Sequence, residues 1–320
     1  MKFRLAFAFG LAILPFASYA DAYPEKMIHM VVAFPAGGPT DLNARLFAKE
    51  ISDQLGQQVI VENKPGAGGN IASAFVASAP PDGYTIYYNT SSLLLGYLLY
   101  SSAKHDPIKD FVPVARTAGT PLVVAANANL QANSLDELIT YVKKNPGKVN
   151  YASSGAGTID HLAGELLNNA LGIKMEHVPY KGTAPAMNDL VGGMTQIMVT
   201  TLNTVRPFIL DQKLKALAIA STNRSNLLPG VATVAEAARL RSFEITAWQG
   251  IVVPAGTPDL VVATLNRAVN AALQKKEFKE KLVSTGSEPY GGTSADYTDY
   301  LKSELVRWKG VIQGAGITRQ

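Results

Sequence analysis

The chain of 320 residues contains no cysteine. This absence excludes disulfides, so packing alone must stabilise the fold, even in an oxidising compartment. It also excludes thiolate nucleophiles and metal sites built on cysteine. Histidine is nearly as scarce. The four present, His29, His105, His161 and His177, form no HExxH motif and are not spaced as paired metal ligands. We therefore expect no metal site.

The sequence also lacks the common nucleotide-binding motifs. No GxxxxGK[ST] sequence is present, which excludes a P-loop. Gly155 and Gly157 begin a GxGxxG pattern, but Asp160 occupies the position of its third glycine, so the dinucleotide fingerprint is incomplete. We expect no organic cofactor.

Charged residues are few and scattered along the chain. Lys and Arg total 29 against 25 Asp and Glu, for a formal net charge of +4, and no basic stretch alternates with aromatic residues. Nucleic acid is therefore not an expected partner. Beyond the N-terminus no apolar run is long enough to span a bilayer, which takes about 20 residues.

The N-terminus has the features of a secretory signal peptide. Lys2 and Arg4 precede a compact apolar run, Leu5–Ala17, and the small-x-small sequences SYA and ADA follow it. We predict a signal peptide over residues 1–22 and a periplasmic location, with a retained N-terminal anchor as the alternative. Without this segment the net charge becomes +4 − 2 + 1 = +3, because two basic residues and Asp21 are removed.

The rest of the chain alternates short apolar runs with amphipathic stretches, which predicts an α/β fold. In the first part, strand, loop and helix follow one another three times, with strands expected at residues 27–34, 58–63 and 84–89. The segment Asp41–Gly56 has helical periodicity, with Asp41 expected as its N-cap and Gly56 at its end. The predicted buried face of this helix consists of Leu42, Leu46, Phe47, Ile51 and Leu55.

A second series of elements follows in the middle of the chain. Strands are expected at residues 121–127, 149–154, 175–179, 195–201 and 215–220, with helices between them, one of which covers 158–172. The apolar segment 247–256 can return the chain to the first part, and helical patterns over 258–285, interrupted, and 294–313 complete it. We predict two lobes, one of residues 23–120 plus 250–320 and one of residues 121–249, which includes the crossing strands.

Two glycine-rich loops occur at strand-to-helix junctions, one in each predicted lobe. They are PAGGPTD (Pro35–Asp41) and SSGAGT (Ser153–Thr158). N–H groups at the start of a helix have no internal partner, and the helix dipole favours an anion there. In open α/β sheets, ligands bind beyond the carboxyl ends of the strands, where both loops are expected. The loops therefore predict a carboxylate or phosphate site, the alternative being tight turns with helix caps. A third loop, Gly66–Gly69, is interpreted as a tight turn onto a helix.

Neutral polar residues follow three other predicted strands. They are NTSS (Asn89–Ser92), YKGT (Tyr180–Thr183) and TLNT (Thr201–Thr204). Such donors suit an anion held by hydrogen bonds in a closing cleft, although Ser, Thr and Asn also favour helix starts. His161, one turn into the helix after SSGAGT, either faces the ligand or packs in the lobe.

An enzyme is the first alternative to a binding protein. A secreted hydrolase or isomerase would use Ser154 and His161, but the GxSxG elbow is absent because Tyr151 and Ala152 precede the serines. We expect no enzymatic activity. A sensory receptor that signals to a membrane kinase is a further alternative, because binding would look the same.

Seven segments occur in a fixed order: VAFPAGGPTDLNAR, VENKPGAGGNIA, PPDGYT, YASSGAGTIDHLAGELL, VPYKGTAPAMNDLVGG, LKALAIAS and GIVVPAGTP. Together they resemble the receptors of tripartite tricarboxylate transporters, also called Bug-type solute receptors, over essentially the whole mature chain. The resemblance implies a class II periplasmic-binding-protein fold, with two Rossmann-like lobes joined by two crossing strands. It also implies a carboxylate bound largely through loop backbone and ordered water, and delivery to a small and a large membrane subunit. We expect a monomer.

The candidate ligand-binding residues combine the two loops with positions that the resemblance implies. They are Phe34, Gly38, Pro39, Thr40, Asp41, Asn89, Ser91, Ser153, Ser154, Gly157, Thr158, His161, Tyr180, Gly182, Thr183 and Asn203. We expect the ligand to close the lobes by bridging the two loops.

The identity of the carboxylate stays open. In family receptors for amino acids, the aspartate of the first loop is thought to meet the ligand ammonium, but Asp41 is equally suited to cap a helix. The candidates are a tricarboxylate such as citrate, a dicarboxylate, an amino acid, a nicotinate-like acid and an aromatic dicarboxylate such as terephthalate. Tyr88, Tyr97 and Tyr180 either stack on a ring or pack within the lobes.

Overall fold

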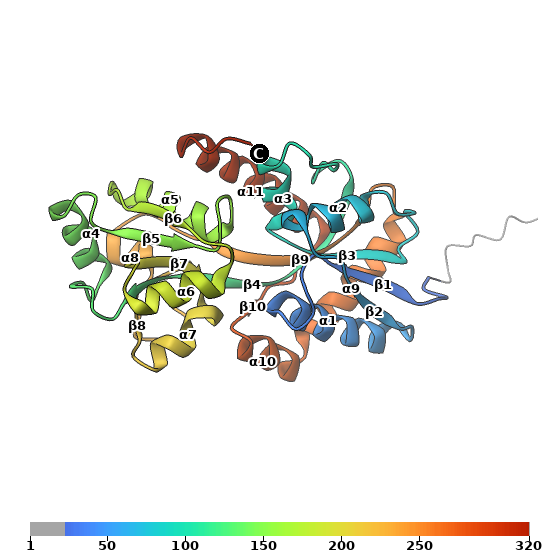
Figure 1. Ribbon diagram of the computed structural model, residues 1–320. Helices are drawn as coiled ribbons and strands as arrows, with labels where there is room; N and C mark the ends of the chain where they lie inside the picture. Colours follow the sequence, from blue (N-terminus) through green and yellow to red (C-terminus); the bar gives the residue numbers. More distant parts are fainter. Residues whose placement is uncertain (1–22, 320) are drawn as a thin grey trace, which may run out of the picture.

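The computed structural model describes residues 23–319 and shows two lobes side by side (Figure 1). Strands β4 (Phe111–Asn127) and β9 (Thr246–Pro254) connect the lobes. The predicted signal peptide, residues 1–22, lies outside the described residues. Within the described part of the chain, no helix combines the length and the apolar character needed to cross a membrane.

The first lobe is built on parallel strands near the N-terminus. β1 (Ile28–Val32) lies between β2 (Val59–Asn63) and β3 (Thr85–Thr90), and β9 pairs antiparallel with β3. These three parallel strands confirm the first three predicted ones. β1 and β3 are almost entirely buried, as expected for strands whose sheet is covered by helices on both faces.

Strand β4 belongs to both lobes. Its first part, from Phe111 to Pro121, pairs antiparallel with β9, and from Leu122 onward it pairs with β7 (Ile197–Thr201) and β8 (Leu214–Ala220). The predicted strand, 121–127, covered only the last seven of the 17 residues of β4, so more than half of this crossing strand was missed. Pro121 lies where the strand changes partners; a proline, which cannot donate a ladder hydrogen bond, is tolerated at such a position.

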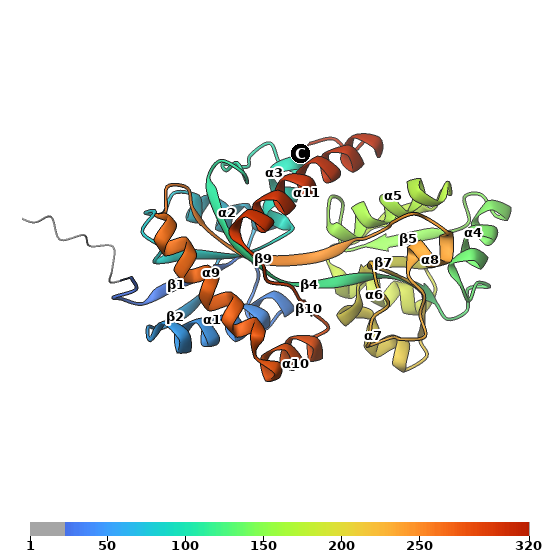
Figure 2. The same ribbon diagram turned by 180° about the vertical axis from the view of Figure 1, so that it is seen from behind.

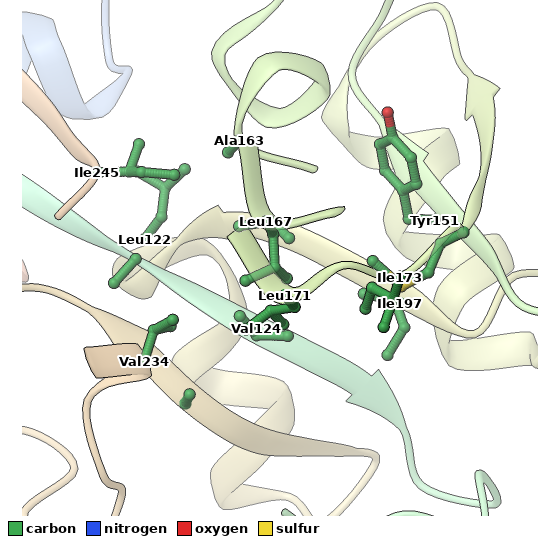
Figure 3. Packing of buried hydrophobic residues seen from close by; sticks show 14 of the residues in the cluster. Leu122, Val124, Tyr151, Ala163, Leu167, Leu171, Ile173, Ile197, Val234 and Ile245 are labelled. Carbon is green, nitrogen blue, oxygen red and sulfur yellow. The ribbon is translucent and has the colours of Figure 1, made fainter. Parts of the chain in front are cut away.

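The second lobe has its own parallel core. β5 (Asn150–Ser153) pairs with β6 (Glu176–Pro179) on one side and with β7 on the other. Its largest apolar cluster joins these strands to the helices above them (Figure 3). Residues of this cluster that Figure 3 labels include Leu122, Val124, Tyr151, Leu167, Leu171, Ile197 and Val234. Packing of this kind supplies the stability that disulfides would otherwise add.

The helices of the described chain surround both sheets. They are α1 (Pro39–Leu55), α2 (Asn70–Ala77), α3 (Ser92–Leu99), α4 (Leu135–Lys144), α5 (Ile159–Leu171), α6 (Thr183–Gly192), α7 (Leu202–Leu210), α8 (Val234–Ala238), α9 (Asp259–Gln274), α10 (Lys276–Ser284) and α11 (Ser294–Gly314), with a 3-10 turn η2 (Ala67–Gly69) and a short strand β10 (Glu288–Pro289). The predicted interruption of the 258–285 pattern is confirmed: extended backbone at Lys275 separates α9 from α10.

Three features of lobe one differ from the sequence prediction. The N-cap of α1 is Gly38 and not Asp41, because Pro39, a residue favoured at the first helical position, begins the helix. Leu42, expected on the buried face, is 47% exposed. Helix α3 was not predicted. The predicted end of α1 is confirmed, since Gly56 is its left-handed C-cap with φ 66°.

The first sheet is made from both ends of the chain and the second from its middle. We propose that residues 23–120 plus 250–320 form one domain, lobe I, and residues 121–249 form the other, lobe II. Figure 2 shows α11 running from lobe I toward α5 of lobe II, so the lobes also meet outside the crossing strands.

Candidate ligand-binding site

The loop between β5 and α5 is held by the first turn of the helix that follows it. The backbone N–H and the hydroxyl of Ser154 both donate to a carboxylate oxygen of Asp160, over 3.3 and 2.6 Å. The N–H of Gly157 donates to Nδ1 of His161 over 3.0 Å. Burial raises the pKa of the Asp160 carboxyl and outweighs the hydrogen bonds from Ser154 and Thr200 that lower it. These contacts fix the loop without using the N–H groups that begin α5.

Several backbone N–H groups in this region remain available to a ligand, including those of Ala156 and Ile159. The hydrogen bonds between described residues leave the N–H of Ala156 without an acceptor. The N–H of Ile159 is at the first position of α5, where no intrahelical acceptor exists. In contrast, the hydroxyl of Thr158 donates to the carbonyl of Gly155 over 2.7 Å. The donors that this loop leaves available to an anion are therefore backbone N–H groups rather than hydroxyl groups.

The loop between β1 and α1 repeats this arrangement in lobe I. The N–H of Gly37 donates to the carboxylate of Asp41 over 2.9 Å, four residues later. Asp41 also accepts hydrogen bonds from Arg45 and Asn63. Burial works against ionisation, but the hydrogen bonds from Arg45, Gly37 and Asn63 hold the pKa of Asp41 below its usual value. In each lobe an acidic residue in the first helical turn thus fixes the preceding glycine-rich loop.

The third glycine-rich loop packs against α3. A Cβ atom at Gly69, whose φ is +96°, would lie 2.7 Å from Oγ of Ser92. A Cβ atom at Gly96 would lie 2.5 Å from Oδ1 of Asn70. The interpretation of Gly66–Gly69 as a turn onto a helix is confirmed, since η2 leads directly into α2. The close packing also brings this loop and α3 to the same side of the cleft.

Loops from both lobes enclose one cavity of about 240 Å³. Its lining from lobe I is Phe34, Gly68, Thr90, Ser91, Ser92, Leu95, Gly96, Leu99 and Tyr100, and from lobe II Ser154, Ala156, Gly157, Thr158 and Ile159. The size suits a small metabolite, because drug-sized ligands usually occupy about 300–1,000 Å³. Both lobes are needed to form it.

The predicted site residues fall into three groups. Phe34, Ser91, Ser154, Gly157 and Thr158 line the cavity. A second group hydrogen-bonds within the protein, behind or beside the loops: Asp41, Asn89, Ser153, His161 and Tyr180. The third group lies at the starts of α1, α6 and α7 and is not part of the cavity lining: Gly38, Pro39, Thr40, Gly182, Thr183 and Asn203.

The cavity also includes residues outside the list of candidate ligand-binding residues. These are Gly68, Thr90, Ser92, Leu95, Gly96, Leu99, Tyr100, Ala156 and Ile159. Thr90, Ser92, Ala156 and Ile159 lie in or beside segments already identified. Leu95, Leu99 and Tyr100 come from α3 and the residue that ends it. They were not identified because the sequence analysis did not predict α3. Of the three tyrosines considered for stacking, Tyr88 is fully buried and its hydroxyl donates to Gln249, and neither Tyr97 nor Tyr180 lines the cavity. Tyr100, which was not considered, lines it.

The two residues of the enzyme hypothesis are not paired with each other. The Ser154 hydroxyl donates to Asp160, and His161 accepts from Gly157. A nucleophilic serine requires a base within hydrogen-bonding reach. A serine–histidine contact does exist between Ser153 and His177, over 2.7 Å, but Ser153 is fully buried.

Comparison with known proteins matches this architecture to one family. Residues 43–317 match the family described as "Tripartite tricarboxylate transporter family receptor". Solved structures similar to this chain include R. palustris Rpa4515 with adipate, at 33% identity, TM-score 0.81 and coverage of 93% of this chain and 100% of that one. The periplasmic binding protein BugD is similar at 36% identity and TM-score 0.76, covering 93% and 100%.

A third similar structure is MatC from Rhodopseudomonas palustris with bound malate, at 33% identity, TM-score 0.75 and coverage of 91% and 100%. These likenesses confirm the predicted two-lobed periplasmic-binding-protein fold. The family match spans most of both lobes and includes the loop that begins α5. The chain therefore belongs to the receptor family of the tripartite tricarboxylate transporters.

Proposed function

We propose that this protein captures a small carboxylate in the periplasm for a tripartite tricarboxylate transporter. The observation that carries the proposal is the cavity built from both lobes at helix starts, with hydroxyl groups and free backbone N–H groups in its lining. Helix N-termini attract anions through unpaired N–H groups and the helix dipole. Similar proteins with bound adipate and malate support a carboxylate ligand, since both compounds are dicarboxylates.

The ligand would bring the lobes together. Ser154, Gly157 and Thr158 are on lobe II, and Phe34 and Ser91 are on lobe I. Each lobe alone offers part of the site, so the closed state binds more tightly and its population rises by that difference in affinity. We propose that Gly38, Pro39, Thr40, Gly182, Thr183 and Asn203 approach the ligand on closure, and that Asp41, Asn89, Ser153, His161 and Tyr180 position the loops.

The proposed location and partners of the protein rest on its predicted signal peptide and on its family. The predicted signal peptide over residues 1–22 would direct the chain to the periplasm, where the structurally similar BugD is a binding protein. The family match supports a small and a large membrane subunit as partners that receive the ligand. We propose a monomeric receptor that returns its ligand unchanged and uses no metal or organic cofactor.

A thermal-shift screen against small carboxylates tests the proposal. A ligand at 100 times its Kd stabilises the folded protein by about 2.7 kcal/mol, which is readily visible as a rise in Tm. Small-angle scattering of the saturated protein should then show a smaller radius of gyration. Absence of any stabilising carboxylate would refute the receptor function, and an unchanged radius would refute closure. Chemical analysis of ligand released from denatured complex distinguishes a receptor from an enzyme.

A further inference from the structure

One wall of the cavity is apolar and comes largely from α3. Leu95 and Leu99, one helical turn apart, line the cavity together with Tyr100 at the end of the helix. Phe34 of lobe I and Ile159 of lobe II contribute further apolar side chains to the lining. Leu95 and Leu99 are at most 6% exposed, so their positions are fixed by packing.

The wall already contacts the binding loop of the other lobe. A Cβ atom added at Gly157 would lie 2.9 Å from Cδ1 of Leu99. The cavity is also lined by hydroxyl groups, those of Thr90, Ser91, Ser92, Ser154 and Thr158, of which Ser91 and Ser92 stand at the start of α3. A ligand that fills it meets these hydroxyl groups at the loops and at the start of α3, and meets hydrocarbon at Leu95 and Leu99 farther along the helix.

No carboxylate is available in this cavity to neutralise a ligand ammonium. Among the residues that the structure describes, no Asp, Glu, His, Lys or Arg lines it. The nearest acidic residue in the first loop, Asp41, is fully engaged. Its Oδ2 accepts from the Gly37 N–H and from Arg45 Nε, each over 2.9 Å, and its Oδ1 accepts from Arg45 Nη2 over 3.0 Å and from Asn63 over 2.8 Å.

A carboxylate has about four acceptor positions, so these four hydrogen bonds saturate Asp41. An ammonium group placed near the loop would have to displace Arg45 or Asn63. Hydroxyl or carboxylate groups placed against Leu95 and Leu99 would lose their hydration without gaining partners. The first effect lowers the affinity for amino acids and the second lowers the affinity for hydroxylated acids, although both kinds of ligand are carboxylates.

From these observations we infer that the receptor selects an amine-free carboxylate with an apolar body, and that α3 is its specificity-determining element. The inference rests on the proposed carboxylate-receptor function and narrows it. It excludes α-amino acids, densely hydroxylated acids such as galactarate, and the tricarboxylate citrate from the high-affinity ligands. It leaves unbranched aliphatic diacids and aromatic acids as the expected class.

Calorimetric titration with matched acids tests this inference on the mature full-length protein. The amine-free members are glutarate, adipate and phenylacetate, and their amino counterparts are glutamate, 2-aminoadipate and phenylglycine. Galactarate, which is adipate with four added hydroxyl groups, and citrate complete the panel. At least one amine-free, apolar-bodied acid should bind at least about tenfold more tightly than its counterparts, a difference readily resolved by this method.

Equal or tighter binding of an amino counterpart, of galactarate or of citrate would overturn the inference while the carboxylate-receptor function stands. Binding of no acid in the panel would overturn both. The variant Ile159→Thr replaces the ethyl branch of the side chain with a hydroxyl and so removes apolar surface from the lining, and it should weaken the best amine-free ligand several-fold. The matched control Ile71→Thr changes an isoleucine that is 52% exposed on α2 and should leave every affinity unchanged. Equal effects of the two substitutions would remove Ile159 and the apolar lining from the site.

Discussion

The imidazole rings of His161 and His177 stack face to face, with centroids 3.8 Å apart and planes inclined by 10°. Both rings touch the glycine-rich loop of lobe II, because His161 accepts from the Gly157 N–H and His177 hydrogen-bonds with Ser153. Burial lowers the pKa of His161, and burial followed by the neighbouring His161 lowers the pKa of His177 to about 4. The loop is therefore shaped by two neutral histidines.

We predict that the protein loses stability as the pH falls from about 6.5 toward 4. The folded state binds fewer protons than the unfolded state here, because the pKa of His177 drops from its ordinary 6.5 to about 4 on folding. Its contribution is therefore present above pH 6.5 and is lost on acidification. His177→Gln, which keeps a hydrogen-bonding group near Ser153, should flatten this decline in urea unfolding experiments. Identical pH profiles for the two proteins, matched at pH 8, would contradict the prediction.

Gly157→Ala should weaken ligand binding by at least about tenfold, as measured by calorimetry. Gly157 has φ +77°, and a Cβ atom there would lie 2.9 Å from Leu99 Cδ1. This clash would push the loop that contains Gly157 away from α3. Gly147→Ala is the matched control, with φ +73° and no atom within 4 Å of the added carbon. Each substitution should cost about 1–2 kcal/mol of stability through backbone strain. Equal affinities of the two variants would place Gly157 outside the site.

Asp41→Asn should destabilise the fold by about 1–3 kcal/mol, because Arg45 and the Gly37 N–H lose a charged acceptor. The control Asp53→Asn interrupts the exposed ion pair with Lys49 on the same helix and should leave the Tm unchanged. Thermal unfolding of both variants at pH 7 measures the difference. A similar Tm for both would show that Asp41 does not hold its loop.

Gln249→Leu should destabilise the folded protein by about 2–4 kcal/mol. Its Oε1 accepts from the Asn43 amide over 2.9 Å and from the Tyr88 hydroxyl over 2.8 Å, so the substitution leaves the Tyr88 hydroxyl without an acceptor and the Asn43 amide with Ser287 alone. Adding Tyr88→Phe removes one of these donors. The double variant should therefore be less destabilised than the two single effects added together. Strict additivity in denaturant unfolding would argue against a shared hydrogen-bond network.

Much of the fold could be predicted because local patterns agree with the tertiary structure. The parallel strands read as short apolar runs, and α5 lies between Thr158 and Gly172, where the pattern placed it. Helix α3 was missed because SLLLGYLL is apolar on all sides; a helix of this kind is buried and shows no periodicity. The first half of β4 was missed because Pro113, Arg116 and Gly119 interrupt its apolar run.

The part of the candidate site that depends on local sequence motifs could be predicted. Glycine-rich loops before helices identified Ser154, Gly157 and Thr158, which line the cavity. The wall formed by Leu95, Leu99 and Tyr100 depends on how α3 meets a loop from the other lobe, a contact between residues far apart in sequence. The saturation of Asp41 likewise depends on Asn63, which a separate strand supplies.

The participation of β9 and β10 in the first sheet imposes an order on folding. During synthesis, which proceeds from the N-terminus, the strands of the second sheet are all made within one contiguous stretch, residues 122–220. The first sheet must wait for β9, at 246–254, and its covering helix α11 ends only at residue 314. Domains tend to fold as units during synthesis. The middle of this chain is thus able to become compact while its first 120 residues still await their partners.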